Sequence, residues 1–230
     1  MKSPLISSVL RLPKVLRGKD FYFFNQTKCN KVTFGNEGAN WTFYPNDLNQ
    51  NSTVYSFGIG TDISFDLALI KKYGIIVHAF DPTPKSIEWL KAQRLPKEFI
   101  SHEYGLASYN GKAKFKLPKN INYISHSIIE NSSTQSESIE VEVLRLSTIM
   151  QQLNHKKIDV LKIDIEGAEY EVIDNILSEN IDIVQILVEF HHRLKPFSIE
   201  KTKQAIQKLN KTGYKVFNVS STGEEYSFIK

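Results

Sequence analysis

Side chains that can accept a proton or bind a metal ion gather after two apolar runs in the second half of the chain. The runs are residues 158–163 and 183–190, and the groups that end or follow them are Asp164, Glu166, Glu189, His191 and His192. If the runs are neighbouring strands of a parallel sheet, these groups meet within about 5 Å at one edge. A carboxylate or imidazole placed there can act as a general base, which makes an alcohol nucleophilic by removing its proton. We therefore predict a catalytic group made of Asp164, His191, Glu166 and Glu189.

The same groups allow other interpretations, which the sequence alone leaves open. Asp164, Glu189 and His191 could instead hold a divalent metal ion. We do not favour a metal, because no compact ligand motif is present and a mixed carboxylate and imidazole set suits Mg²⁺ or Mn²⁺ only in part. Glu166 also suits the start of a helix, where an acid stabilises the helix dipole. His191 equally suits a loop histidine that is bonded to the backbone.

Three further charged residues near this group need an explanation. Lys162 lies inside the first apolar run, where its amine is costly to bury unless it pairs with Glu166 or Glu189 or extends out of the sheet. Glu169 and Glu171 follow in a helical pattern, and we expect both to be solvated helix residues.

An earlier stretch has the pattern of a nucleoside-binding turn. The apolar run 54–57 ends at Gly58 and Gly60, and helical spacing of apolar residues follows. Glycines let the backbone approach a ligand closely, and the start of a helix offers unpaired N–H groups. Asp81 ends the next apolar run, 23 positions after Gly58, close to the spacing expected for a carboxylate that binds both ribose hydroxyls. Either feature alone suits an ordinary turn, but the two together indicate a nucleoside site.

Positions 62 and 63 indicate which nucleoside is bound. A dinucleotide-binding turn needs a third glycine where the bulky Ile63 stands, and Asp62 places a negative charge where a pyrophosphate would lie. S-adenosylmethionine has no phosphate, and its cationic α-amino group would be attracted to Asp62. We therefore predict S-adenosylmethionine as the cofactor, with an NAD-binding oxidoreductase as a less favoured alternative. A second role for Asp62 as a helix cap is compatible with this prediction.

Alternating strands and helices must position these residues. Apolar runs predict strands at residues 54–57, 75–80, 98–103, 158–163 and 183–190. Helical periodicity predicts helices over residues 65–70, 85–93, 168–177 and 199–209. The last two strands, 214–219 and 225–229, are joined by a short turn with a glycine and predict an antiparallel hairpin. The pattern predicts a Rossmann-like α/β fold, with a mostly parallel sheet and helices on both faces.

The remaining segments are less regular. Residues 1–50 are interpreted as an N-terminal extension with one short helix, which we expect to help close the site, and residues 51–230 as the main domain. Residues 113–117 and 138–146 predict strands of alternating polarity. The polar span between them suggests a flap over the site, and it contains His126, a second candidate base or substrate contact.

Composition limits the class of protein. The hydrophobic fraction is 41%, the net charge is +4, and the single Cys29 excludes an internal disulfide. No run approaches the ~18 apolar residues that span a membrane, and no signal peptide is recognisable. We expect a cytoplasmic protein. The basic residues at the start suit a solvated extension or a weak contact with an anionic membrane surface.

Nucleic acid is not an expected partner. The motif typical of base methylation, an Asp or Asn followed by Pro-Pro and an aromatic residue, is absent after residues 158–163. The acidic residues found there would repel a phosphate backbone.

Four segments resemble motifs of the FkbM-type methyltransferases, especially the branch that includes animal methyltransferase-like proteins. They are residues 54–66 (VYSFGIGTDISFD), 80–84 (FDPTP), 159–169 (DVLKIDIEGAE) and 188–191 (VEFH). The resemblance runs from about Thr53 to the C-terminus. It implies the seven-stranded methyltransferase fold, S-adenosylmethionine as methyl donor, and O-methylation of a hydroxyl on a glycan, lipid-linked or small-molecule acceptor.

The resemblance also implies roles for individual residues. Asp164 would lie beside the transferable methyl group, and residues 103–106 would face the adenine. The implied cofactor-binding residues are Gly58, Ile59, Gly60, Asp62, Asp81, Pro82, Glu103, Tyr104, Gly105 and Leu106. Many family members carry an acid at the position of Ser56 and a glycine at that of Asp62, so the contacts to the methionine part differ here. A catalytically inactive protein with the same fold is the alternative, because a fold alone does not prove chemistry.

Overall fold

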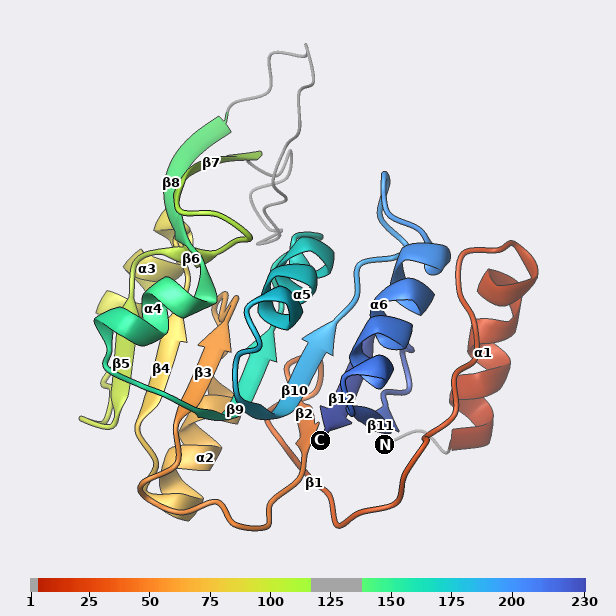
Figure 1. Ribbon diagram of the computed structural model, residues 1–230, viewed down its shortest axis with the longest axis horizontal. Helices are drawn as coiled ribbons and strands as arrows, with labels where there is room; N and C mark the ends of the chain where they lie inside the picture. Colours follow the sequence, from red (N-terminus) through yellow and green to blue (C-terminus); the bar gives the residue numbers. More distant parts are fainter. Residues whose placement is uncertain (1–3, 117–137) are drawn as a thin grey trace.

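The computed structural model describes residues 4–116 and 138–230, and a seven-stranded sheet forms its centre (Figure 1). The strands of this sheet are β3 (Val54–Phe57), β4 (Val77–Phe80), β5 (Phe99–His102), β9 (Ile158–Ile163), β10 (Ile183–Glu189), β11 (Lys215–Val219) and β12 (Glu225–Ile229). Their order is β11-β12-β10-β9-β3-β4-β5, and only β12 runs antiparallel to its neighbours. The predicted fold class and the predicted C-terminal hairpin are both confirmed.

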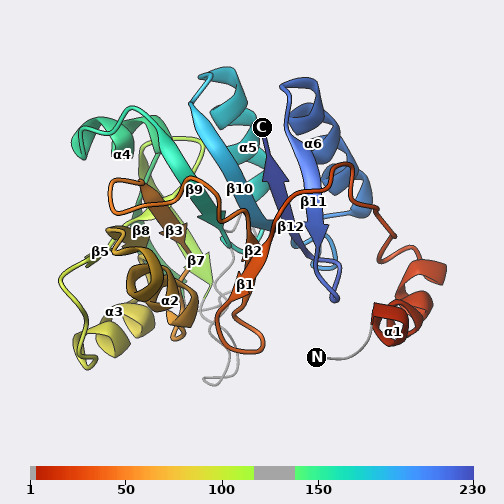
Figure 2. The same ribbon diagram turned by 90° about the horizontal axis from the view of Figure 1, so that it is seen from below.

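Helices cover both faces of the sheet, as Figure 2 shows. One face carries α4 (Leu146–Gln152), α5 (Glu169–Ser178) and α6 (Ile199–Lys211). The other carries α2 (Ser64–Tyr73), α3 (Pro84–Lys91) and a short hairpin of β1 (Val32–Phe34) and β2 (Trp41–Phe43). Successive residues of a strand point to opposite faces, so Tyr55 and Phe57 enter one core cluster and Val54 enters the other.

Local signals set the ends of the helices. Helix α2 ends at Gly74, which adopts the left-handed conformation and donates its N–H to the Ile70 carbonyl at 2.8 Å. Helix α3 has Pro84 at its first position, where a proline loses no hydrogen bond. Helix α6 is capped by the hydroxyl of Ser198, which accepts from the Lys201 N–H.

The N-terminal segment packs against the main sheet. Helix α1 (Pro4–Leu16) is the short helix expected there, and it lies at the β11 edge beside α6 (Figure 1). The hairpin β1–β2 was not predicted, because three-residue strands are too short to show a period. Its residues Trp41 and Phe43 are nevertheless buried in the core. None of the helices among the described residues has the length and apolar composition to cross a bilayer.

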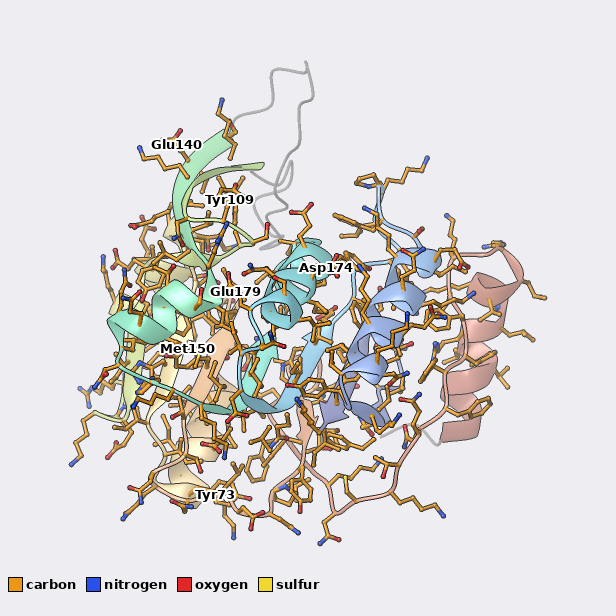
Figure 3. All side chains as sticks on the ribbon, in the orientation of Figure 1. Tyr73, Tyr109, Glu140, Met150, Asp174 and Glu179 are labelled. Carbon is orange, nitrogen blue, oxygen red and sulfur yellow. The ribbon has the colours of Figure 1, made fainter. Side chains whose placement is uncertain are left out.

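A small second sheet lies above the β4 and β5 ends of the main sheet (Figure 1). It consists of β6 (Gly105–Leu106), β7 (Gly111–Lys116) and β8 (Ser138–Leu144) in the order β6-β8-β7. The strand predicted to reach Leu146 ends earlier, because Leu146 begins helix α4, which the sequence did not predict. Figure 3 shows Glu140 on β8 beyond the main sheet, where it pairs with Lys112 at 2.7 Å. The predicted flap, with His126, lies outside the described residues.

Candidate active site

A cleft of about 260 Å³ opens where the parallel strands of the main sheet end. Its walls come from the turn after β3, the ends of β4, β9 and β10, and residues 38–41 of the N-terminal segment. Aromatic side chains form part of the wall, and the rings of Phe57 and Phe80 stack at 4.3 Å between centroids. The predicted contribution of the first 50 residues to this cleft is therefore visible in Trp41.

The turn after β3 requires glycine on geometric grounds. Gly58 and Gly60 have φ values of 72° and 52°, in the left-handed region that favours glycine. A Cβ on Gly58 would lie 1.6 Å from the carbonyl oxygen of Asp164. The Gly58 N–H donates to the Phe80 carbonyl at 3.0 Å. The turn is thus held between the ends of β4 and β9, with its backbone facing the cleft.

Asp81 is fixed at the wall of the cleft by the same turn. One carboxylate oxygen accepts the Gly60 N–H at 3.0 Å. The other accepts the N–H and the hydroxyl of Thr83 at 2.9 and 2.6 Å. The side chain is buried apart from its exposure to the cleft. Each oxygen of a carboxylate has more than one acceptor site, so Asp81 can still accept from a ligand hydroxyl.

Asp62 also lines the cleft and lies two residues before helix α2. Its carboxylate accepts the Ser64 N–H at 2.8 Å and the amide of Asn36 at 3.0 Å. Burial acts to raise the pKa of Asp62, but these hydrogen bonds outweigh it and lower that pKa. The carboxylate is therefore ionised at neutral pH. The carboxylate thus bonds the first residue of α2 and at the same time faces the cleft.

Lys162 holds the glycine turn from within the sheet. Its amine donates to the carbonyls of Phe57 and Gly58 at 3.2 and 2.8 Å and lies 5.1 Å from the centre of the Trp41 ring. Neither alternative left open by the sequence, a pair with Glu166 or Glu189 or extension out of the sheet, describes these contacts. Backbone carbonyls and an aromatic face stabilise the buried cation instead. The positions of residues along the sequence could not predict these contacts, because Phe57 and Gly58 lie over 100 residues from Lys162.

A buried acid lies on the same side of the sheet as Lys162. Asp66 of α2 is buried, and burial raises its pKa to about 6, although Lys162 and the Ser56 hydroxyl act to lower that pKa. Ser56 is the position at which the resemblance to FkbM-type methyltransferases implies an acid in many family members. In this chain the neighbouring acid comes from the helix.

His191 is the centre of the predicted catalytic group. Its Nε2 lies 3.3 Å from Glu166, 3.8 Å from Asp164 and 4.0 Å from Glu189. Its Nδ1 lies 3.2 Å from Glu169, whose same oxygen accepts the His191 N–H at 2.8 Å. The four predicted residues therefore do lie together. Glu169, expected to be solvated, is instead fully buried, whereas Glu171 is exposed as expected.

The closely spaced acids shift the pKa values of the groups in this site. Burial, and then the neighbouring carboxylates, raise the pKa of Asp164 and of Glu189. Burial acts to lower the pKa of His191, but the hydrogen bond to Glu169 and the nearby acids raise it to about 10. Such a group favours a positively charged ligand, because a cation relieves the repulsion between carboxylates.

Some predicted residues lie apart from the cleft. Leu106 and Pro82 line it, but Glu103, Tyr104 and Gly105 are not among the described residues that do. Glu103 has a 59% exposed side chain and pairs with Lys91 at 3.2 Å. Tyr104 lies 3.4 Å from His102 through its hydroxyl. Of the predicted adenine segment, residues 103–106, Leu106 alone is among the described residues that line the cleft.

His192, adjacent to His191, belongs to a different cluster. Its Nε2 lies 3.7 Å from the buried carboxylate of Asp20, which also binds Arg11 and Arg193. Burial, and then the charge of Arg193, lower the pKa of His192 to about 4. Consecutive residues after a strand face opposite sides, so only His191 joins the site.

Comparison with known proteins gives a family and several relatives. The sequence profile of the methyltransferase FkbM domain matches residues 24–216. The chain is 26% identical over 160 residues to the probable methyltransferase-like protein 24 of Homo sapiens, covering 69% of this chain and 37% of that protein. It is 27% identical over 127 residues to the hexuronic acid methyltransferase AglP of Haloferax volcanii. This match covers 54% of this chain and 51% of that protein. The chain thus spans only about a third to a half of these relatives.

Among solved structures, the fold is similar to that of a methyltransferase FkbM from Methylobacillus flagellatus. The TM-score is 0.48 and the sequence identity 12%, over 79% of this chain and 44% of that one.

Proposed function

Because the chain belongs to the family of methyltransferases with an FkbM domain, we propose that it is an S-adenosylmethionine-dependent O-methyltransferase. The proposed acceptor is a sugar hydroxyl on a glycan, lipid-linked or small-molecule substrate. One observation carries the proposal: the glycine turn with Asp81 and the carboxylates beside His191 line a single cleft. Cofactor and acceptor can therefore meet there, at the strand ends where α/β sheets bind ligands.

The charge of the cleft supports this cofactor over a dinucleotide. Among the described residues that line it, the acids are Asp62, Asp81, Asp164, Glu166, Glu189 and Glu225. The only base among them is Lys162, whose amine is bound to backbone carbonyls. A diphosphate would be repelled by this lining, whereas a sulfonium and an ammonium group would be attracted.

The residues present suit the parts of S-adenosylmethionine. Asp81 would accept hydrogen bonds from the ribose hydroxyls, and Gly58 and Gly60 would let the methionine part lie along the turn. Asp62 would attract the ammonium group. When bound, the cofactor supplies a methyl group: the acceptor oxygen bonds to it, the sulfur keeps the electron pair of the broken bond, and the hydroxyl proton passes to a base of the protein.

We assign the role of base to Glu189. It lines the cleft at the end of β10, and its carboxylate accepts no hydrogen bond from the described residues. Asp164 and Glu166 are nearer to the imidazole of His191, which is itself held by Glu169. Glu189 is therefore the acid most available to an acceptor hydroxyl. Burial and Asp164 raise its pKa, so Glu189 would act as a base once a bound cation, such as the sulfonium of the cofactor, lowers that pKa again.

The relative from Haloferax volcanii suggests a class of acceptor to test first. It is a hexuronic acid methyltransferase, so we propose a saccharide that carries a hexuronic acid as the first acceptor class to test. The hydroxyls of a sugar match the polar mouth of the cleft, to which Asn40 and the acids after β9 and β10 contribute.

Two measurements on the full chain test the proposal. Calorimetry should show binding of S-adenosylmethionine without NAD binding, and Asp81→Ala should weaken that binding about 10- to 100-fold. Methyl transfer to the acceptor, followed by mass spectrometry, should fall about 10²- to 10⁴-fold in Glu189→Gln with cofactor affinity retained. Glu171→Gln, an exposed glutamate on α5, is the matched control. Tighter binding of NAD, or unchanged turnover in Glu189→Gln, would contradict the proposal.

A further inference from the structure

The imidazole of His191 has a different carboxylate environment on each ring nitrogen. On the Nδ1 side, the fully buried Glu169 lies at 3.2 Å, and its two oxygens also accept the N–H groups of His191 and Gly167 at 2.8 and 2.7 Å. These bonds fix the orientation of the ring. A buried carboxylate on one nitrogen is the usual partner of a histidine that binds a metal ion through the other.

The Nε2 side has the spacing of a ligand set. Nε2 and one oxygen each from Asp164 and Glu166 all lie within 4.8 Å of one another. Nε2 is 3.3 Å from Glu166 and 3.8 Å from Asp164. Ligands about 2.1 Å from a common ion lie about 3.0–3.4 Å apart, so small side-chain movements would complete the set.

Four carboxyl groups surround the imidazole of His191. The carboxylates of Asp164, Glu166, Glu169 and Glu189 all lie within 4.0 Å of its ring nitrogens. A divalent cation between Asp164, Glu166 and Nε2 would offset carboxylate charge that is costly to bury without a partner, and its binding would release any proton held on Nε2. An acceptor that carries a carboxylate of its own would add to the repulsion.

We propose that Asp164, Glu166 and His191 bind a divalent cation at the mouth of the cleft, with Glu169 as the residue that orients the histidine. The two carboxylates suit a cation of the Mn²⁺ type, and the single imidazole makes a transition-metal ion a better match than Mg²⁺. The role of the ion in catalysis rests on the proposed function. There it would bind the acceptor through the hydroxyl that is to be methylated, next to Glu189, and stabilise the negative charge that develops on that oxygen.

The test measures Mn²⁺ binding by electron paramagnetic resonance, on the chelator-treated full chain without cofactor or acceptor. We expect one Mn²⁺ per chain. Asp164→Asn and His191→Gln should each weaken binding at least about tenfold, and Glu169→Gln about 10- to 100-fold. The matched control is Asp174→Asn. Figure 3 shows Asp174 on α5, where its exposed carboxylate pairs with Lys208, so this change should leave Mn²⁺ binding unaltered.

Folding of each variant is checked separately by thermal unfolding, where Mn²⁺ should raise the Tm of the wild type but not that of His191→Gln. No Mn²⁺ uptake by the folded wild type, or uptake that the three variants leave unchanged, would overturn the proposal. Binding of S-adenosylmethionine by the same chelator-treated protein is measured in parallel. Cofactor binding without Mn²⁺ uptake would refute the metal site alone, and Mn²⁺ uptake without cofactor binding would refute the proposed function alone.

Discussion

The α-carbon of Gly58 packs directly on the backbone of Asp164, so that a side-chain carbon on Gly58 would lie 1.6 Å from the Asp164 carbonyl oxygen. Asp164 donates its N–H to the Phe57 carbonyl at 3.2 Å across the same contact. The turn proposed to bind the cofactor and the proposed catalytic group are therefore joined through main-chain atoms. A substitution that moves the backbone of the glycine turn must therefore also move the backbone of Asp164.

Gly58→Ala should affect both halves of the site. The new methyl group cannot fit without moving the end of β9, and alanine is also strained at a φ of 72°. We expect affinity for S-adenosylmethionine to fall at least about tenfold, as measured by calorimetry. Gly74→Ala is the control, because Gly74 has a similar φ of 67° but a Cβ there would meet only Gln50, at 3.9 Å. Equal loss of cofactor affinity in both variants would show that packing against Asp164 is unimportant.

Lys162→Met should loosen the glycine turn from within the sheet. Methionine keeps most of the apolar stem but removes the donor to the carbonyls of Phe57 and Gly58. The loss of charged hydrogen bonds predicts about 10- to 100-fold weaker binding of S-adenosylmethionine. The control is Lys157→Met. Lys157 is half-exposed, pairs with Asp159 at the start of β9 and makes no contact with the glycine turn among the interactions of the described residues. Cofactor affinity equal to the wild type in Lys162→Met would contradict this role.

The stability of the protein should fall in mild acid through a histidine cluster at β4 and β5. His78 lies 3.1 Å from His102 and its ring contacts His155. Burial, and then the two neighbouring histidines, lower the pKa of His78 to about 4. The unfolded chain, with an ordinary histidine pKa near 6.5, then binds more protons than the folded chain between pH 6.5 and 4. Unfolding free energy should therefore decrease as the pH falls through this range.

Urea unfolding at several pH values, compared between the wild type and His78→Leu, measures this contribution. We expect His78 to account for about 1–2 kcal/mol of stability lost between pH 7 and 5. The comparison is needed because burial raises the pKa of Asp66, which gives a pH dependence of opposite sign. Parallel stability curves for the two proteins would show that His78 is not buried in its neutral form.

Asp20 should be essential for holding the N-terminal helix. Its fully buried carboxylate binds Arg11 at 2.9 Å and Arg193 at 2.5 Å. Burial acts to raise the pKa of Asp20, but the two arginines lower it to about 2. Removing one partner of a buried charge cluster costs about 3–5 kcal/mol, so Asp20→Ala should be strongly destabilised in urea unfolding.

The matched control for Asp20→Ala is Glu200→Ala. Glu200 pairs with Lys203 on the surface of α6, where an ion pair contributes about 0–1 kcal/mol. A loss in Asp20→Ala no larger than in this control would mean that the cluster does not anchor α1. Cofactor binding should survive in Asp20→Ala wherever the protein remains folded, because Asp20 is not among the described residues that line the cleft.

The sequence by itself determined the alternation of strands and helices, the antiparallel end of the sheet, and the position of acids after β9 and β10. These features depend on periodicity and on residues that are near one another in the chain. Gly58 and Asp81 were recognisable for the same reason, since each lies at the end of a strand that the pattern predicts.

Only the tertiary structure decided which groups face one another. It placed the amine of Lys162 under the carbonyl of Gly58, buried Glu169 behind His191 and directed His192 to the other side. It also brought Trp41 from the N-terminal segment into the wall of the cleft. These contacts join segments about 20 to 170 residues apart, and side-chain direction at a strand end depends on packing that no local pattern records.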